Sequence, residues 1–277
     1  MTRKLAGWLC LPLVLAACSD GQDARVNAAA IAASAGLRRM DIRTGTFDLV
    51  AYVRFAAAPV LRVYIEGDGH AWMRRDIPSE DPTPWNPVAL DLAAVDPAPS
   101  VAYLARPCQY IAAGTDPGCR VYYWTEGRYA EPVIASMNAA IDRLLAASGA
   151  ESLELIGFSG GGSVAALVAA RRQDVANLRT VAANLDTAAW IAEQRLSRLT
   201  GSLNPADFTD TLVYLPQMHF SAADDSVVGI AVLRAFQGRF ARRNCVGAEI
   251  VPGVGHGDGW QAVWPSLLRR PVRCAGR

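Results

Sequence analysis

Residues 155–170 read LIGFSGGGSVAALVAA and place Ser159 among four glycines. The residues before the serine, 153–158, predict a buried strand, and those after it predict an apolar helix that ends near Arg171. Gly157, Ser159 and Gly161 match the pattern G-x-S-x-G, which forms a sharp strand-to-helix turn that exposes the serine. Glycines suit this turn because a side chain would collide where the helix and strand close up. We therefore expect Ser159 to be a nucleophile at the end of a central strand.

The rest of the chain alternates strand-like and helical segments. Strands are expected at 46–55, 61–65, 101–108, 178–185, 218–225 and 248–256, and helices at 131–148, which Gly149 terminates, and near 227–240. The proline-rich residues 77–99 are expected to form a loop, and 187–211 an irregular insert that could be a lid. This alternation predicts an α/β fold with a mostly parallel central sheet, helices on both faces and the ligand site at the carboxyl ends of the strands.

A serine hydroxyl becomes a useful nucleophile only when a base takes its proton and a carboxylate orients that base. The chain has three histidines. In a strand–turn–helix site of this kind the order along the chain is serine, acid, histidine, and both His70 and His219 precede any suitable acid. This leaves His256, in the segment PGVGHGDGW, as the expected base.

With these residues at suitable strand ends, the chain resembles the α/β-hydrolase family over nearly all of residues 41–277. The resemblance implies that the triad acid follows the strand that ends HFSAADD, and Asp224 matches the family position best. Asp225 is the adjacent alternative, and Asp186 would serve in a variant layout. Two positions depart from the family pattern, because Ser221 replaces the usual glycine and Val228 a frequent proline.

The resemblance also implies an oxyanion hole built from two backbone N–H groups. One is expected from Gly160, directly after the nucleophile, and the other from Asp68 or Gly67 in the segment YIEGDGH. Glu66 stands there in place of a histidine that many relatives carry. Trp72, Trp190 and Trp260 are expected near the rim of the pocket or in the core.

The amino end reads MTRKLAGWLCLPLVLAACSD, with two basic residues before the apolar run 5–15. This pattern is typical of a secretory signal, and the run is too short to span a membrane. Residues 15–18 resemble a bacterial lipobox, which implies cleavage before Cys18 and diacylation of its thiol. An ordinary cleaved signal, cut after Ala17, is the alternative. Ser19, which is not an aspartate, favours the outer membrane, with the protein facing the periplasm.

These features divide the chain into a signal at 1–17, a tether with a first short helix at 18–40 and the hydrolase domain at 41–277. Four cysteines remain after Cys10 and Cys18 are set aside, an even number that suits an exported protein with two disulfides. The local pairing joins Cys108 to Cys119 and Cys245 to Cys274, and other pairings are open. A zinc site is disfavoured because no close C-x-x-C pair occurs.

The formal charge of +1 provides no basic excess for nucleic acid, which is not expected as a partner. We expect no cofactor and a small-molecule acyl substrate; the oligomeric state is left open. The expected activity is serine hydrolysis of a carboxylic ester or a related acyl bond. The alternative is a non-catalytic envelope lipoprotein that uses the same fold as a binding module, which the departures at Glu66 and Ser221 motivate.

Overall fold

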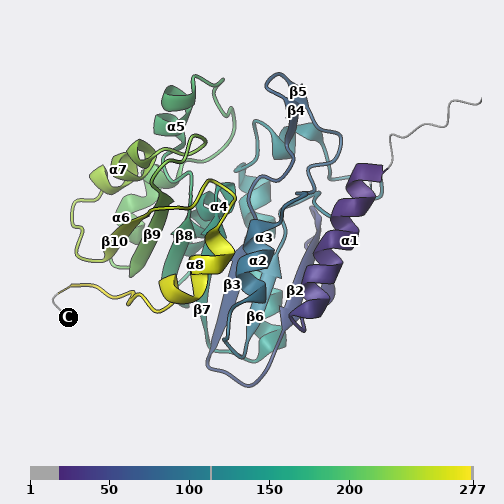
Figure 1. The fold of residues 1–277 in the computed structure, drawn as a ribbon, viewed down its shortest axis with the longest axis horizontal. Helices are drawn as coiled ribbons and strands as arrows, with labels where there is room; N and C mark the ends of the chain where they lie inside the picture. The colour runs from purple at the N-terminus through teal and green to yellow at the C-terminus, as the bar shows by residue number, and fades with distance from the viewer. Residues whose placement is uncertain (1–18, 113, 276–277) are drawn as a thin grey trace, which may run out of the picture.

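The computed structural model describes residues 19–112 and 114–275, with side chains from residue 23 onward. An eight-stranded sheet runs through this part of the chain in the order β1-β2-β6-β3-β7-β8-β9-β10 (Figure 1). Strand β2 is antiparallel to both β1 and β6, and all other neighbours are parallel. The strands are β1 (Arg38–Arg43), β2 (Asp48–Arg54), β3 (Val60–Ile65), β6 (Val101–Leu104), β7 (Ser152–Phe158), β8 (Val175–Val181), β9 (Gln217–Ala222) and β10 (Val246–Val251).

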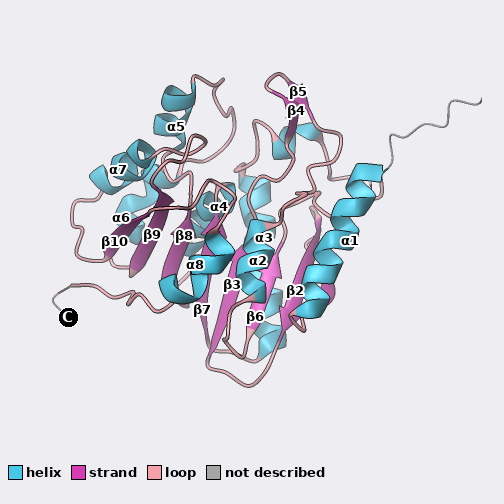
Figure 2. Ribbon diagram, viewed as in Figure 1, coloured by secondary structure: helices cyan, strands magenta, loops and turns pink. Residues whose placement is uncertain are grey.

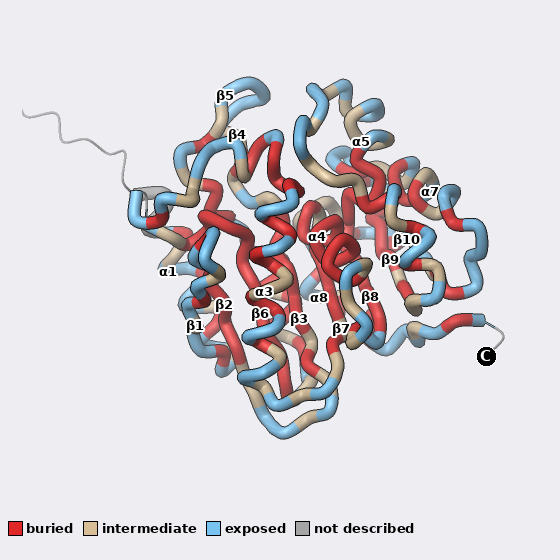
Figure 3. The backbone as a smooth tube through the Cα atoms, turned by 180° about the vertical axis from the view of Figure 1, so that it is seen from behind, coloured by how far each residue is buried: buried red, intermediate tan, exposed pale blue. Residues whose placement is uncertain are grey.

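Helices cover both faces of the sheet (Figure 1), and the strands between them are largely buried (Figure 3). Each face has its own apolar core. One core contains buried residues of α3 (Glu131–Ser148), α4 (Gly160–Ala169) and α7 (Ile230–Gly238). The other contains buried residues of α1 (Ser19–Ser34), α2 (Val88–Ala94) and α8 (Trp260–Leu267). The central strands serve both cores because successive side chains point to opposite faces: Val63 and Ile65 lie in the first core and Tyr64 in the second.

The expected strands are present, and the helix at 131–148 ends at Gly149, which has a φ of 70°. Several shorter elements lie between the long strands and helices (Figure 2). They are the hairpin β4 (Trp72–Arg74) and β5 (Ile77–Pro78), α5 (Thr187–Gln194), α6 (Thr209–Leu212) and the 3-10 turns η1 (Val121–Trp124) and η2 (Pro205–Phe208). None of the described helices is long and apolar enough to cross a membrane.

Three segments differ from the sequence expectation. Residues 38–43 form the edge strand β1, so the sheet begins inside the segment assigned to a tether, and the helix before it is 16 residues long. The segment 77–99 contains β5 and α2 as well as loop, and 187–211 contains α5, η2 and most of α6. Helix α2 gives no periodic signal because most of its seven residues are buried, and α5 begins at a cap, where the Asp186 carboxylate accepts the N–H groups of Ala188 and Ala189.

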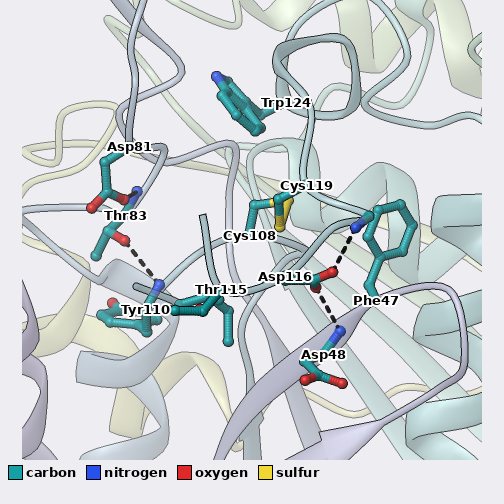
Figure 4. Close-up of a disulfide and its surroundings, with 12 residues drawn as sticks. Phe47, Asp48, Asp81, Thr83, Cys108, Tyr110, Thr115, Asp116, Cys119 and Trp124 are labelled. Carbon is teal, nitrogen blue, oxygen red and sulfur yellow. Dashed lines mark hydrogen bonds between the residues drawn. A yellow bond between two sulfur atoms is a disulfide. The ribbon is translucent and has the colours of Figure 1, made fainter. Parts of the chain in front are cut away.

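Two disulfides join the four cysteines in the local pairing, Cys108 to Cys119 and Cys245 to Cys274. The first closes a loop against the start of β2, where the Asp116 carboxylate accepts the backbone N–H of Asp48 (2.8 Å) and of Gly118 (2.7 Å) (Figure 4). The second ties the start of β10 to the carboxyl-terminal segment after α8. Cys18 and the expected signal lie outside the described residues.

Candidate active site

Ser159 lies at the turn between β7 and α4, with φ 51° and ψ −123°. Non-glycine residues rarely adopt a positive φ, and such strain is held where a structure needs a side chain in an unusual direction. A Cβ atom at Gly157 would lie 2.3 Å from the carbonyl oxygen of Gly161, and one at Gly161 would lie 2.3 Å from that of Ile65. The glycines are therefore required by close approach of the helix to the ends of β7 and β3.

The structure brings His256 to this serine. Its Nε2 atom lies 3.0 Å from Ser159 Oγ, and its Nδ1 atom lies 2.8 Å from Asp225 Oδ2. His256 follows β10 in a loop that is fixed by the Trp260 indole, which donates to the carbonyl oxygens of Gly255 and His256. The three side chains come from three different loops at the carboxyl ends of β7, β9 and β10.

The carboxylate at His256 belongs to Asp225, so the preference for Asp224 was wrong and the adjacent alternative is the residue in contact. Asp225 is buried, whereas Asp224 is exposed. The second oxygen of Asp225 accepts the backbone N–H groups of Val227 (2.8 Å) and Val228 (2.9 Å). Asp186, the third candidate, caps α5 and lies 3.6 Å from Arg239.

Burial alone would raise the pKa of Asp225. The hydrogen bond from His256 and the backbone N–H groups of Val228 and Val227 more than offset this and leave the pKa below its ordinary value. Asp225 is therefore a carboxylate at neutral pH, and its hydrogen bond requires a proton on Nδ1 of His256. Nε2 is then free to accept a proton from Ser159.

The backbone N–H groups expected to bind an oxyanion differ in whether they already have a hydrogen-bond partner. The N–H of Gly67 already donates to Glu66 Oε1 at 2.8 Å. Those of Asp68 and Gly160 have no hydrogen-bond partner within the described chain. The two loops touch, because a Cβ atom at Gly160 would lie 2.1 Å from Asp68 Oδ1. Asp68 and Gly160 are thus the amides that remain available beside Ser159.

The side chain of Asp68 points into a cluster of arginines. Its carboxylate accepts hydrogen bonds from Nη1 of Arg128 (2.7 Å) and of Arg106 (3.1 Å), and the Tyr129 hydroxyl lies 3.4 Å away. Burial would raise the pKa of Asp68, but Arg128 and Arg106 outweigh it and lower the pKa. The charge next to Gly160 is therefore neutralised, as an oxyanion site requires.

Glu66 lies under the same loop and is 1% exposed. Desolvation raises its pKa to about 7, although the backbone N–H groups of Gly67 and Ala89 favour the ionised form. His219 is buried as well, beside Thr180, and desolvation lowers its pKa to about 3, so this histidine is neutral. It lies outside the site, as the order of residues along the chain implies.

A cleft of about 850 Å³ opens over Ser159 and His256. Trp72 and Trp190 line it, whereas Trp260 lies in the core beneath. Sequence reasoning missed Trp85, whose ring stacks on His70 with centroids 4.1 Å apart, and Arg128, which lines the cleft beside Trp190. Neither belongs to a motif, so only the fold brings them to the site.

No protein-family model matches the sequence, and no curated protein matches it. Solved structures do match. An α/β serine hydrolase homologue from Coxiella burnetii is 18% identical, covering 83% of this chain and 92% of its own, with a TM-score of 0.55. A serine hydrolase without a lid from Xanthomonas campestris is 14% identical, covering 84% of this chain and 94% of its own, with a TM-score of 0.54. An esterase from Pyrococcus furiosus is also 14% identical, covering 84% of this chain and 90% of its own, with a TM-score of 0.57. Together with the strand order and the turn at Ser159, these likenesses show that the chain has the α/β-hydrolase fold.

Proposed function

We propose that this protein is a serine hydrolase that cleaves carboxylic esters through an acyl-enzyme. The observation that carries the proposal is the chain of contacts from Ser159 Oγ to His256 Nε2 (3.0 Å) and from His256 Nδ1 to Asp225 Oδ2 (2.8 Å). A serine, a base and an orienting carboxylate at these distances are the parts that acyl transfer needs. The esterase and serine hydrolase structures of the same fold support ester bonds as the first substrates to test.

In the acylation step, Ser159 Oγ attacks the ester carbonyl while His256 Nε2 takes the hydroxyl proton. Asp225 stabilises the resulting imidazolium and keeps its ring in place. The carbonyl oxygen becomes an oxyanion, which accepts hydrogen bonds from the N–H groups of Gly160 and Asp68. The tetrahedral intermediate collapses when His256 gives its proton to the leaving alcohol, and Ser159 is left acylated.

Deacylation repeats these steps with water as the nucleophile. His256 Nε2 takes a proton from the water as it attacks the acyl carbonyl, and the same two N–H groups hold the second oxyanion. His256 then returns the proton to Ser159 Oγ, and the carboxylic acid leaves. The cleft of about 850 Å³ is large enough for a small-molecule ester.

A fluorophosphonate probe tests this proposal because it reacts with an activated serine. We expect covalent labelling of the wild type, none of Ser159→Ala and strongly reduced labelling of His256→Ala. Ser197→Ala is the matched control, since Ser197 lines the same cleft without contacting His256. Hydrolysis of p-nitrophenyl esters should follow the same pattern. A folded wild type that is neither labelled nor active would favour a binding module instead.

We also propose that the protein is exported and held to a bacterial membrane through an acylated Cys18. The support is the basic start, the short apolar run and the small residues that precede this cysteine. The two disulfides are consistent with an oxidising compartment.

A further inference from the structure

The cluster beside the proposed oxyanion site carries an unbalanced positive charge. Two arginines, Arg106 and Arg128, share the single carboxylate of Asp68, and their side chains are only 5% and 7% exposed. The Nε atom of Arg106 is buried without a hydrogen-bond partner in the described chain. Because burying a charge is costly unless it is paired, a cluster with one excess cation favours an added anion.

Of the two arginines in this cluster, Arg128 is the one that lines the cleft. Its Nε atom donates to the carbonyl oxygen of Thr125, and its Nη1 atom donates to Asp68. The guanidinium also lies over the Trp190 ring, 5.9 Å from its centroid. These contacts fix the group in one orientation, and Nη2 has no partner among the described residues. Nη2 is therefore a charged, pre-positioned donor at the wall of the cleft.

The other charged side chains around the cleft also favour binding of an anion. Arg74, Arg75 and Arg198 lie at its mouth, and Arg75 donates to the carbonyl oxygens of Gln194 and Arg195 across it. The carboxyl groups that line the cleft, besides Asp68, are those of Glu126 and Glu66. Glu126 is exposed, and burial raises the pKa of Glu66 to about 7, so its charge is only partly present at neutrality. Cationic groups therefore outnumber ionised carboxylates.

Arg128 is also close to the reacting atoms. It contacts Asp68, whose carboxylate lies against the Cα atom of Gly160, the residue next to Ser159. A ligand group that binds Nη2 would thus share the cleft with a carbonyl carbon at Ser159.

We infer that Arg128 binds a carboxylate carried by the substrate a few bonds from the scissile ester, so that half-esters of dicarboxylic acids are preferred over neutral esters. The ester bond in this inference rests on the proposed function, whereas the carboxylate-binding site at Arg128 does not. Guanidinium groups suit this role because they bind carboxylates through short, charge-assisted hydrogen bonds.

Binding to the Ser159→Ala protein tests the anion site without turnover. Calorimetry would compare monomethyl glutarate with its neutral terminal amide, which has the same length. We expect the carboxylate to bind at least about 10-fold more tightly, and Arg128→Gln to weaken it by about 10- to 100-fold with little effect on the amide. Arg172→Gln is the matched control, because its side chain is 8% exposed and paired with Asp142 and Asp174 away from the cleft. The inference would be overturned if the two ligands bound with equal affinity, or if neither ligand bound.

Kinetics then separate substrate binding from positioning of Asp68. With p-nitrophenyl hemiglutarate and p-nitrophenyl pentanoate as substrates, we expect Arg128→Gln to raise KM for the hemiester by a larger factor than for the neutral ester, beyond any change that both esters share through Asp68. Equal changes in kcat and KM with the two esters would mean that Arg128 acts only through Asp68, and the inference would be wrong. Arg128→Lys keeps the charge and should retain part of the preference, which provides a variant if the glutamine substitution does not fold.

The two proposals fail in different ways. Selective binding of the carboxylate by a protein that turns over no ester would retain the anion site and remove the hydrolase assignment. Turnover of both esters without preference, together with equal binding of the two ligands, would retain the hydrolase assignment and remove the anion site.

Discussion

At the scale of single residues, the neighbours Asp224 and Asp225 show how the fold selects between similar side chains. Both follow β9, but only Asp225 is turned inward, where its two oxygens bind His256 and the N–H groups of the next turn. Asp224 is exposed and has no part in these contacts. The motif and the order of residues predicted Ser159 and His256, whereas the choice of acid depends on how the chain turns after Ala222, which no local pattern specifies.

We predict that Asp225→Asn lowers kcat by roughly 10³- to 10⁴-fold, because the amide cannot hold the Nδ1–H tautomer of His256 or stabilise its imidazolium. Asp224→Asn is the matched control and should change kcat by less than about 2-fold, as expected for an exposed group outside the triad. Steady-state kinetics on one p-nitrophenyl ester measures both. A larger loss in Asp224→Asn than in Asp225→Asn would contradict the assignment.

Glu66 gives a prediction for stability against pH. Its pKa rises from 4.5 in an ordinary setting to about 7 in the folded protein, so between these values the folded chain holds a proton that the unfolded chain has lost. The free energy of unfolding must therefore fall as pH rises through this window. Glu66→Gln removes this contribution, and we expect the mutant to gain about 2 to 3 kcal/mol relative to the wild type between pH 5 and pH 8.

Urea unfolding at the two pH values measures this difference. The comparison of mutant with wild type isolates Glu66 from groups such as His219, whose pKa of about 3 makes the fold less stable as pH falls. If the free energy of unfolding changed equally in the mutant and the wild type between pH 5 and pH 8, Glu66 would be ionised in the folded protein.

At the scale of elements, strands and long helices were predictable because their apolar periodicity is strong, as in α3 and β7. The segments that shape the cleft were harder. Helix α2 is short and has no side-chain cap, and the β4–β5 hairpin lies at the surface with little apolar alternation. These elements depend on tertiary contacts, such as those between α2 and both α1 and α8. The walls of the site therefore carry less local signal than the sheet that supports it.

The two disulfides should have different effects on activity. The loop closed by Cys108 and Cys119 carries Gln109, whose Nε2 donates to the carbonyl oxygen of Gly67 (3.0 Å), so this bridge supports the loop that bears Asp68. Each double serine variant should lose about 3 kcal/mol of unfolding free energy. Only the Cys108→Ser/Cys119→Ser protein should also lose kcat, whereas Cys245→Ser/Cys274→Ser should keep it.

Denaturant unfolding and ester kinetics at a temperature where both variants stay folded make this comparison, with each variant serving as the control for the other. Equal loss of kcat in the two proteins would show that the Cys108–Cys119 loop has no special link to the site.

At the scale of the whole molecule, the first helix matters for how the domain could be held at a membrane. Helix α1 packs on the domain through Ala24, Ala28 and Ala32, which are buried. Its early turns contact the segment that leads to the cleft, because Arg25 pairs with Asp81 and Asn27 donates to the carbonyl oxygen of Trp85. Within the described residues α1 begins at Ser19, so the proposed anchor at Cys18 adjoins this packed helix in the sequence. An acylated Cys18 would then hold the domain close to the lipid surface.

We therefore predict that the full chain, expressed in a bacterium, partitions with membranes and that mass spectrometry finds acylated Cys18 as the first residue. Buried acyl chains contribute about 0.8 kcal/mol per methylene, so removing the thiol in Cys18→Ala should move the protein to the soluble fraction. Cys10→Ala is the matched control, since that cysteine lies within the segment to be removed, and it should leave the distribution unchanged. An unmodified amino terminus at Cys18 in the wild type would instead indicate an ordinary cleaved signal, and the packed helix α1 would then serve only to complete the core on that face of the sheet.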